Sequence, residues 1–276
     1  MSRVEVLLAT MHRENTDFLK EMNIQTDIVV ANQADSFSYA ENIDENGNRV
    51  RFVTTSSRGL SKNRNLAFSY ASGEFLLLAD DDLRFCDGLE GMVTKAFDSL
   101  PQADIIVFNT ETLNMPDDRL SREGNSKSFK VGLLNFSRYG SCSIAIRRSS
   151  LAKSRIKMSE FFGAGSGKIS CGEDSIFLRD TLRSGMKIYA YPATISVIDQ
   201  SSSSWFTSCD EKFMYDKGAV CGTMFPILGI VFKYYFAMRF YKKSELGFFK
   251  TVSLIKKGMK YGKRGISYGE YAEGKR

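Results

Sequence analysis

Residues 57–85 read SRGLSKNRNLAFSYASGEFLLLADDDLRF, and the organisation of this stretch decides the fold. A helix is predicted over residues 62–72, with Ser61 as its N-cap and Gly73 as its C-terminal stop. The apolar run FLLLA follows at once and is continuous rather than alternating, as in a strand covered on both faces by helices. Three consecutive carboxylates then end the strand, where open α/β sheets bind their ligands.

Other apolar runs of strand length recur along the chain, with helical patterns between them. This alternation predicts an α/β fold. We expect strands at residues 4–9, 27–32, 50–54, 75–79 and 104–108, and two more at 187–191 and 194–198, separated by Pro192. A second helix is predicted to begin near Glu173 and to end at Gly185. Residues 109–139 are polar and without a clear period, so we expect a long surface excursion on the acceptor side.

The acidic triplet is the most informative feature of the chain. Asp80, Asp81 and Asp82 repel one another at the predicted strand end, and a divalent cation would relieve that repulsion. Oxygen-only ligands favour Mg2+ or Mn2+, which would bridge a diphosphate and neutralise the charge that develops as it departs. The alternative is a solvated acidic turn in which Asp82 caps the following segment. The triplet by itself does not separate these alternatives.

The order of features in residues 57–85 resembles the diagnostic segment of family 2 glycosyltransferases. A Gly-Leu turn, a helix carrying Arg-Asn, a Gly-Glu stop, an apolar strand and a DxD motif follow one another as in that family. The resemblance implies a GT-A fold, with a nucleotide-binding, mixed and mostly parallel sheet flanked by helices, and a nucleotide-sugar donor. It places Asp80 near the ribose or nucleotide and Asp81 or Asp82 on the metal.

The resemblance further implies that donor-binding residues gather at the ends of the first strands. The expected set is Ala9, Thr10, Asn32, Arg58, Arg64, Asp80 and Asp81. Asn32 replaces the acidic residue usual after the second strand, and Asp35 is a weaker substitute. The guanidinium groups of Arg58 and Arg64 suit a diphosphate, although each alone could be a solvated surface charge. The chain has only one histidine, His12, so a His-rich metal site is excluded.

The Gly-rich stretch at residues 161–174, FFGAGSGKISCGED, fails the phosphate-loop pattern, because Phe162 and Ile169 stand where Gly and Ser or Thr are required. It resembles instead the approach to the Glu-Asp motif of family 2 enzymes. That resemblance makes Asp174, with Glu173 beside it, the base that takes a proton from the acceptor hydroxyl in an inverting transfer. Alternatively, both carboxylates only stabilise the N-terminus of the following helix.

After the helix predicted to begin near Glu173, the sequence departs from the family 2 pattern in two ways. The QxxRW signature of processive synthases is absent, which favours single addition over polymerisation. The late metal-binding His of many GT-A enzymes is also missing, and Asp199 is a speculative substitute. The only tryptophan, Trp205, could stack on an acceptor sugar or close the core.

Charge is concentrated at the C-terminal end. The chain carries +6, whereas the segment from Lys233 to Arg276 has 12 Lys or Arg and 3 Asp or Glu. The rest is therefore mildly acidic, which argues against nucleic-acid binding. Residues 218–232 are uncharged but too short to span a membrane, and the aromatic and basic residues that follow are typical of an interfacial helix.

We therefore expect a catalytic domain over residues 1–215 and a membrane-associating extension over residues 216–276. The alternative is that the extension packs on the catalytic domain or on a dimer partner. The five cysteines are scattered without a CxxC pair, and the first apolar run is too short for a secretory signal. These features favour a cytoplasmic protein, peripheral at the inner face of the cell membrane.

The combined prediction is an inverting glycosyltransferase, of the kind involved in bacterial surface polysaccharide synthesis. It would use Mn2+ or Mg2+ to transfer a sugar from a nucleotide diphosphate donor to a hydroxyl of a lipid-linked glycan. A UDP-sugar is the favoured donor, and the protein could form a homo-oligomer. One alternative is a sugar-phosphate nucleotidyltransferase, which would be expected to have a Gly-rich basic loop where this chain has ATMHRENT. Another is a catalytically silent, membrane-bound scaffold.

Overall fold

The computed structural model describes residues 2–114, 123–199, 209–226 and 229–274, apart from the side chains of Asp199 and Ile230. Trp205 lies outside the described residues, as do Ile227 and Leu228 of the uncharged run at residues 218–232. The chain divides into two compact units, and each is described by itself. The first comprises Met1–Arg58, Lys62–Lys157 and Phe177–Ser203, and the second comprises Gly59–Ser61, Met158–Ile176 and Ser204–Arg276.

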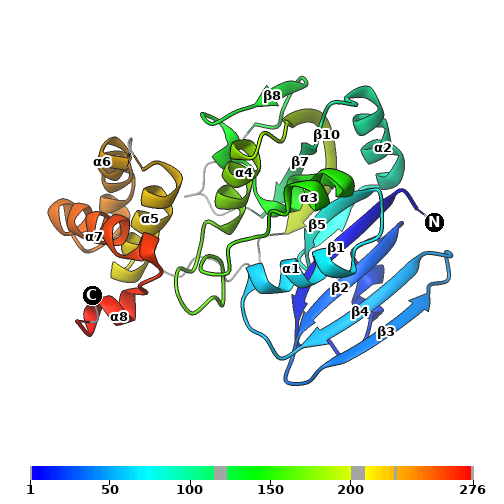
Figure 1. Ribbon diagram of the computed structural model, residues 1–276, viewed down its shortest axis with the longest axis horizontal. Coiled ribbons are helices and arrows are strands. Elements are labelled where there is room, and N and C mark those ends of the chain that lie inside the picture. The colour runs from blue at the N-terminus through cyan, green and yellow to red at the C-terminus, as the bar shows by residue number, and fades with distance from the viewer. Residues whose placement is uncertain (1, 115–122, 200–208, 227–228, 275–276) are drawn as a thin grey trace. The chain divides into compact units, whose positions relative to one another are not determined.

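The first unit is built on a mixed, mostly parallel sheet (Figure 1). Its described strands lie in the order β3-β4-β2-β1-β5-β9-β7-β10-β6, and β8 pairs with β10. The parallel strands are β1 (Val4–Met11), β2 (Asp27–Gln33), β4 (Arg49–Thr55), β5 (Phe75–Asp80), β7 (Ile105–Leu113) and β10 (Ile188–Asp199). The antiparallel strands are β3 (Ser38–Ile43), β6 (Leu83–Phe85), β8 (Phe129–Val131) and β9 (Ile144–Arg147). The predicted α/β sheet is thus confirmed.

Both faces of the central strands are buried, as their continuous apolar runs predict. On one face Val6, Leu8 and Ile28 pack in a core that includes residues of α2 (Leu89–Ser99) and the 3-10 helix η1 (Asp17–Lys20). Leu7, on the opposite face of β1, is equally buried, and α1 (Leu60–Tyr70) crosses the sheet on the side toward the viewer in Figure 1. The helices α3 (Arg148–Ser154) and α4 (Glu173–Arg183) follow later in the chain.

Two details of the predicted elements were wrong. α1 begins at Leu60, so Ser61 lies inside the helix rather than capping it, and its hydroxyl donates to the carbonyl of Phe162 at 2.7 Å. β10 is one strand, not two, although it contains Pro192. Its pairing with β7 is irregular between Ala190 and Ser196, and its other neighbours pair only outside that interval. Proline is tolerated there because no neighbouring strand needs its missing N–H.

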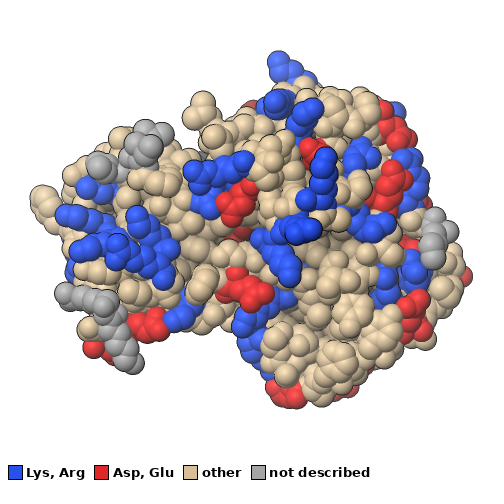
Figure 2. Space-filling view, viewed as in Figure 1, with Lys and Arg blue, Asp and Glu red and all other residues tan. Residues whose placement is uncertain are grey.

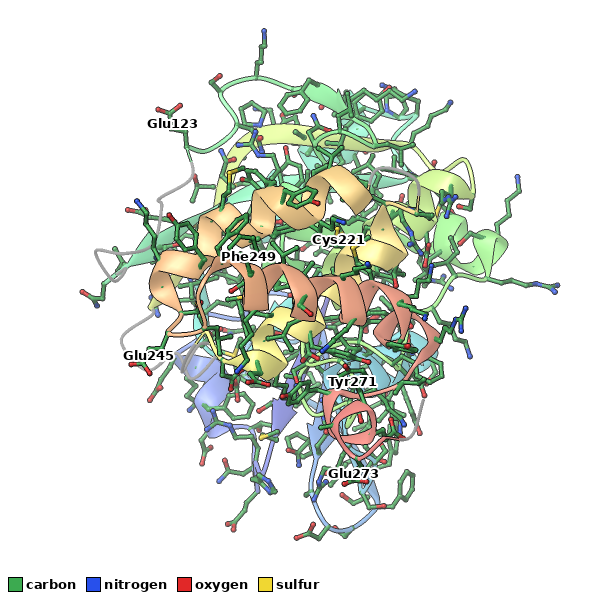
Figure 3. The ribbon with its side chains drawn as sticks, turned by 90° about the vertical axis from the view of Figure 1, so that its left-hand side faces the viewer. Glu123, Cys221, Glu245, Phe249, Tyr271 and Glu273 are labelled. Atoms are coloured by element: carbon green, nitrogen blue, oxygen red, sulfur yellow. The ribbon has the colours of Figure 1, made fainter. Side chains whose placement is uncertain are left out.

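The second unit contains most of the chain's C-terminal helices. They are α5 (Glu211–Met224), α6 (Gly229–Phe240), α7 (Phe248–Lys260) and α8 (Tyr268–Ala272), with the 3-10 helices η4 (Tyr241–Lys243) and η5 (Gly262–Arg264). Asp210 caps α5 by accepting from the amide of Phe213 at 2.7 Å. Figure 3 faces these helices, with α6 and α7 lying side by side. Among the residues that the structure describes, no helix is both long and apolar enough to cross a membrane.

Glycines allow α5 and α7 to approach at backbone distance. A Cβ atom on Gly218 of α5 would lie 2.1 Å from the carbonyl oxygen of Ile255, and one on Gly258 of α7 would lie 1.9 Å from that of Tyr215. These neighbours are backbone atoms, which cannot turn aside as a flexible side chain can. The crossing therefore requires glycine on both helices.

Gly258→Ala is expected to destabilise the protein by about 3 kcal/mol or more, the upper end of the overpacking range, because the two helices must separate to admit the methyl group. Thermal unfolding followed by circular dichroism measures this effect. Gly91→Ala in α2 is the matched control, since no atom lies within 4 Å of its added Cβ and alanine is the better helix former. A Gly258→Ala protein that melts with the wild type would contradict the close crossing.

Candidate active site

The carboxyl ends of the parallel strands bring most of the predicted donor residues to one edge of the sheet. In the strand register Thr10 lies beside Asn32, Asn32 beside Thr54, and Ala9 beside Asp80. Ala9, Thr10 and Asn32 are buried, whereas Asp80 is partly exposed. This edge is where a parallel α/β sheet binds its ligands.

Asp80 is held by a buried guanidinium group. Arg64 is 1% exposed, and its Nη2 donates to Asp80 Oδ1 at 2.7 Å and to Ser141 Oγ at 2.6 Å. The thiol of Cys142 lies 3.4 Å from Asp80 Oδ2. A carboxylate bound in this way keeps a fixed orientation. Because Arg64 is buried, we expect it to affect donor binding indirectly, by holding the Asp80 carboxylate in place.

Asp81 is oriented by the end of β1 and by the turn that follows. Its Oδ2 accepts from Thr10 Oγ1 at 2.5 Å and from Arg13 Nη2 at 3.0 Å. The guanidinium of Arg13 also lies 4.5 Å from the centre of the Phe18 ring. The second oxygen of Asp81, Oδ1, accepts no hydrogen bond from the described residues, and the side chain is 31% exposed. This oxygen is therefore available to a ligand.

Asp80 and Asp81 each form an ion pair with an arginine, whereas Asp82 forms none with the described residues. Burial, followed by repulsion from Asp80, raises the pKa of Asp82 to about 6. Unfolded aspartate has a pKa of about 3.9, so between pH 4 and 6 the folded protein retains a proton that the unfolded chain has lost. Stability contributed by this group is consequently lost as pH rises through about 6.

Asp82→Asn is accordingly expected to raise the melting temperature at pH 7.5 in metal-free buffer, because the neutral amide is spared the burial and repulsion of the charge. The difference from wild type should shrink toward pH 4.5, where folded Asp82 is already protonated. Thermal melts at both pH values, with exposed Asp87→Asn as the control, measure it. A melting temperature below wild type at pH 7.5 would show that the ionised carboxylate stabilises the fold.

The carboxylates at this edge fit part of a Mg2+ or Mn2+ site. Within the described ranges, no group of three or more His, Cys, Asp and Glu side chains is placed to hold a metal ion. Mg2+, however, is commonly bound by one or two carboxylates together with substrate phosphates and water. Asp81, whose Oδ1 accepts no hydrogen bond from the described residues, and the neighbouring carboxylate of Asp82 have the oxygen ligands for that arrangement.

The other expected donor residues have partners within the protein. The side-chain amide of Asn32 donates to the carbonyl of Arg13 at 2.9 Å and accepts from its N–H at 3.0 Å, so it fixes the turn after β1. Arg58 donates to Asp35 Oδ1 at 2.5 Å and to the carbonyl of Ala34 at 2.7 Å, while His12 is exposed with a φ of 54°.

Three residues of this edge were not predicted from the sequence. Arg13 contacts Asp81, Ser141 contacts Arg64, and the buried amide of Asn63 donates to the carbonyls of Thr10 and Ala31 at 3.1 and 2.7 Å. Asn63 ties α1 to both strands. Its position in the helix of the diagnostic segment was the available signal, whereas nothing local in the sequence connects Ser141 to the site.

The expected base lies in the second unit, at the first turn of α4. Glu173 is 4% exposed and Asp174 is more accessible, so Asp174 is the better placed of the two to meet an acceptor. The preceding Gly172 has a φ of 88°, and a Cβ there would lie 2.5 Å from Cγ2 of Val220 in α5. Within this unit, α5 therefore packs directly against the residue that precedes the Glu-Asp motif.

Comparison with known proteins places the first unit's sequence in a family. The model of the family described as glycosyl transferase family 2 matches residues 16–155, half of the chain. The chain belongs to glycosyl transferase family 2. This assignment confirms the family expected from residues 57–85, and the match contains the acidic strand end and Arg64. No curated protein sequence matches the chain.

Solved structures of Staphylococcus aureus TarS share the fold. TarS 1-349 in complex with UDP-GlcNAc superimposes with a TM-score of 0.58 at 17% identity, over 87% of this chain and 73% of that one. TarS 1-349 alone gives 0.54 at 15% identity, over 80% and 64%. A longer TarS chain gives 0.55 at 16% identity, over 88% and 44%. This family 2 chain thus has the expected GT-A fold and spans under two thirds of some of these TarS chains.

Proposed function

We propose that this family 2 chain is an inverting glycosyltransferase that transfers a sugar from a nucleotide diphosphate donor to an acceptor hydroxyl. A UDP-sugar is the favoured donor. The observation that carries the proposal is the ordered acidic edge, in which Arg64 holds Asp80 while Thr10 and Arg13 hold Asp81. Family membership supports it, and so does the similar TarS structure in complex with UDP-GlcNAc.

The residues at this edge would divide the work of donor binding. Asp80, fixed by Arg64, would accept hydrogen bonds from the ribose or nucleotide. Asp81 and Asp82 would hold Mg2+ or Mn2+, which when bound neutralises the diphosphate as it leaves. Arg13, which already contacts Asp81 at 3.0 Å, contributes a positive charge on the same side of the strand end. Ala9 and Thr10 would border the base.

Asp174 would act as the base of the transfer. The acceptor oxygen forms its bond to the anomeric carbon as the bond from that carbon to the diphosphate oxygen breaks, and the hydroxyl proton passes to the Asp174 carboxylate. It lies in the first turn of α4, where the helix dipole favours a negatively charged side chain. Buried Glu173 would help to position this turn.

We further propose a lipid-linked glycan as the acceptor, reached by peripheral binding to the inner face of the cell membrane. The support is the basic C-terminal segment together with apolar side chains that it exposes. Val231 of α6 is 66% exposed and Phe249, labelled in Figure 3, is 87% exposed. Such side chains can enter a headgroup boundary while neighbouring Lys and Arg attract anionic lipid.

Nucleotide release from a panel of nucleotide sugars tests the proposal. With Mn2+ the purified full-length chain should hydrolyse at least one UDP-sugar slowly, releasing UDP, and an added acceptor should increase the rate. The nucleotidyltransferase alternative predicts pyrophosphate release from UTP and a sugar phosphate instead. Binding of neither nucleotide sugars nor UTP would leave the scaffold alternative.

A further inference from the structure

A concave, basic surface lies in the second unit and is lined by residues of neither the acidic edge nor the Glu-Asp motif. It has a volume of about 460 Å3, within the range of small-ligand sites, and spans α6, α7 and η5. Its lining residues are Lys233, Lys256, Met259, Lys260, Lys263 and Arg264. We call this surface the basic pocket. Figure 2 shows Lys and Arg side chains gathered over α7, at the left.

The cations of the basic pocket are not balanced by the protein. No Asp or Glu lines the pocket, and among the described residues none of its five cations forms an ion pair. Lys233 and Lys260 instead lie 4.7 and 4.8 Å from the ring centres of Tyr234 and Tyr261. Lys256 and Lys260 are four residues apart on α7, a spacing at which like charges destabilise a helix.

Three other lysines of the same unit form ion pairs. Lys168 contacts Glu270, Lys212 contacts Asp216 and Lys250 contacts Glu211, each at 2.5 Å. These three lysines have carboxylate partners within the unit, whereas the five cations of the basic pocket lie together around one concave surface and have none in the described part of the chain. That grouping favours an external anion as their partner.

We propose that the basic pocket binds a phosphomonoester or diphosphate group carried by the acceptor or by the lipid around it. Five cationic side chains around one concavity favour a multiply charged phosphate over a single carboxylate, and the planar guanidinium of Arg264 can donate two parallel hydrogen bonds to it. The inference rests on the proposed function for its purpose, since a phosphate bound here would anchor an acceptor substrate. It adds a binding site separate from the donor diphosphate.

Binding of two phosphate probes by the full-length chain tests the proposal in metal-free buffer, where the donor site lacks its cation. The probes are inorganic pyrophosphate, followed by calorimetry, and phosphatidylcholine vesicles with or without 30 mol% phosphatidic acid, followed by sedimentation. Lys260→Gln combined with Lys263→Gln should weaken phosphate binding about thirtyfold, given the usual contribution of a lysine near an anionic surface. The melting temperature should stay unchanged or rise, because like charges are removed.

The matched control is Lys242→Gln combined with Lys243→Gln, which removes the same charge from exposed positions outside the pocket. It should remain within about twofold of wild type. Binding of both probes supports a lipid headgroup, and binding of pyrophosphate alone supports a soluble phosphate. Equal losses in the two double variants, or no binding of either probe, would overturn the pocket. Separate titration of wild type with UDP and Mn2+ tests the donor site, so either proposal can fail alone.

Discussion

Asp174→Asn is expected to lower the turnover of the transfer reaction by roughly 100- to 10,000-fold, the usual cost of losing a general base. The amide keeps the size of the carboxylate and stays in the first turn of α4, but it cannot accept the acceptor proton. UDP affinity should change little, because the proposed donor residues belong to the strand ends of the other unit. Steady-state kinetics with acceptor, together with UDP titration, separate these two effects.

Asp180→Asn is the matched control, because it removes a carboxylate from the same helix. Asp180 pairs with the neighbouring Arg179 at 2.6 Å and has no proposed part in the reaction. It should keep near wild-type turnover. If Asp174→Asn also keeps wild-type turnover but melts at a lower temperature, the carboxylate serves only the helix terminus.

Asp81→Ala is expected to weaken UDP binding in the presence of Mn2+ by about 100-fold. The estimate corresponds to about 3 kcal/mol, the upper range for one interaction with a charged group. The variant removes the carboxylate that joins Thr10 and Arg13 and offers its free oxygen to the cation. Calorimetric titration with UDP and Mn2+ measures the change directly.

Asp87→Ala serves as the control for Asp81→Ala. Asp87 is an exposed carboxylate a few residues later that accepts from Asn23 at 2.9 Å, so it tests whether general loss of negative charge matters. Its UDP affinity should match wild type. If Asp81→Ala and Asp87→Ala bind UDP with the same affinity, the acidic edge does not bind the donor.

The sequence predicted the core elements of the fold because their signals are local. Apolar runs of strand length located β1, β2, β4 and β5, and the helix that begins at Glu173 was also confirmed. β3 could not be found in this way. All six of its residues, SYAENI, are exposed, so its existence depends on pairing with β4 rather than on an apolar pattern. The predicted break at Pro192 was wrong for the same reason. Only the pairing of the neighbouring strands shows that no backbone N–H is needed at that position.

The acidic edge was predictable in position but not in its contacts. Strand ends of a parallel sheet must share an edge, which brought Thr10 and Asp80 to the same place. The pairing of Arg64 with Asp80 and of Arg13 with Asp81 depends on side-chain directions across the fold. From the sequence, Arg64 could be a diphosphate ligand or a solvated surface charge. In the structure it is buried and donates to the Asp80 carboxylate.

Calorimetric titration of the wild-type chain with UDP, in Mn2+ and again in excess chelator, tests the central claim most directly. Saturable binding to one site in Mn2+ that disappears in chelator is the predicted result. Binding should also raise the melting temperature, since a ligand at 100 times its Kd stabilises by about 2.7 kcal/mol. A chain that binds no UDP in Mn2+, or binds it equally well in chelator, would contradict the proposed metal-dependent donor site.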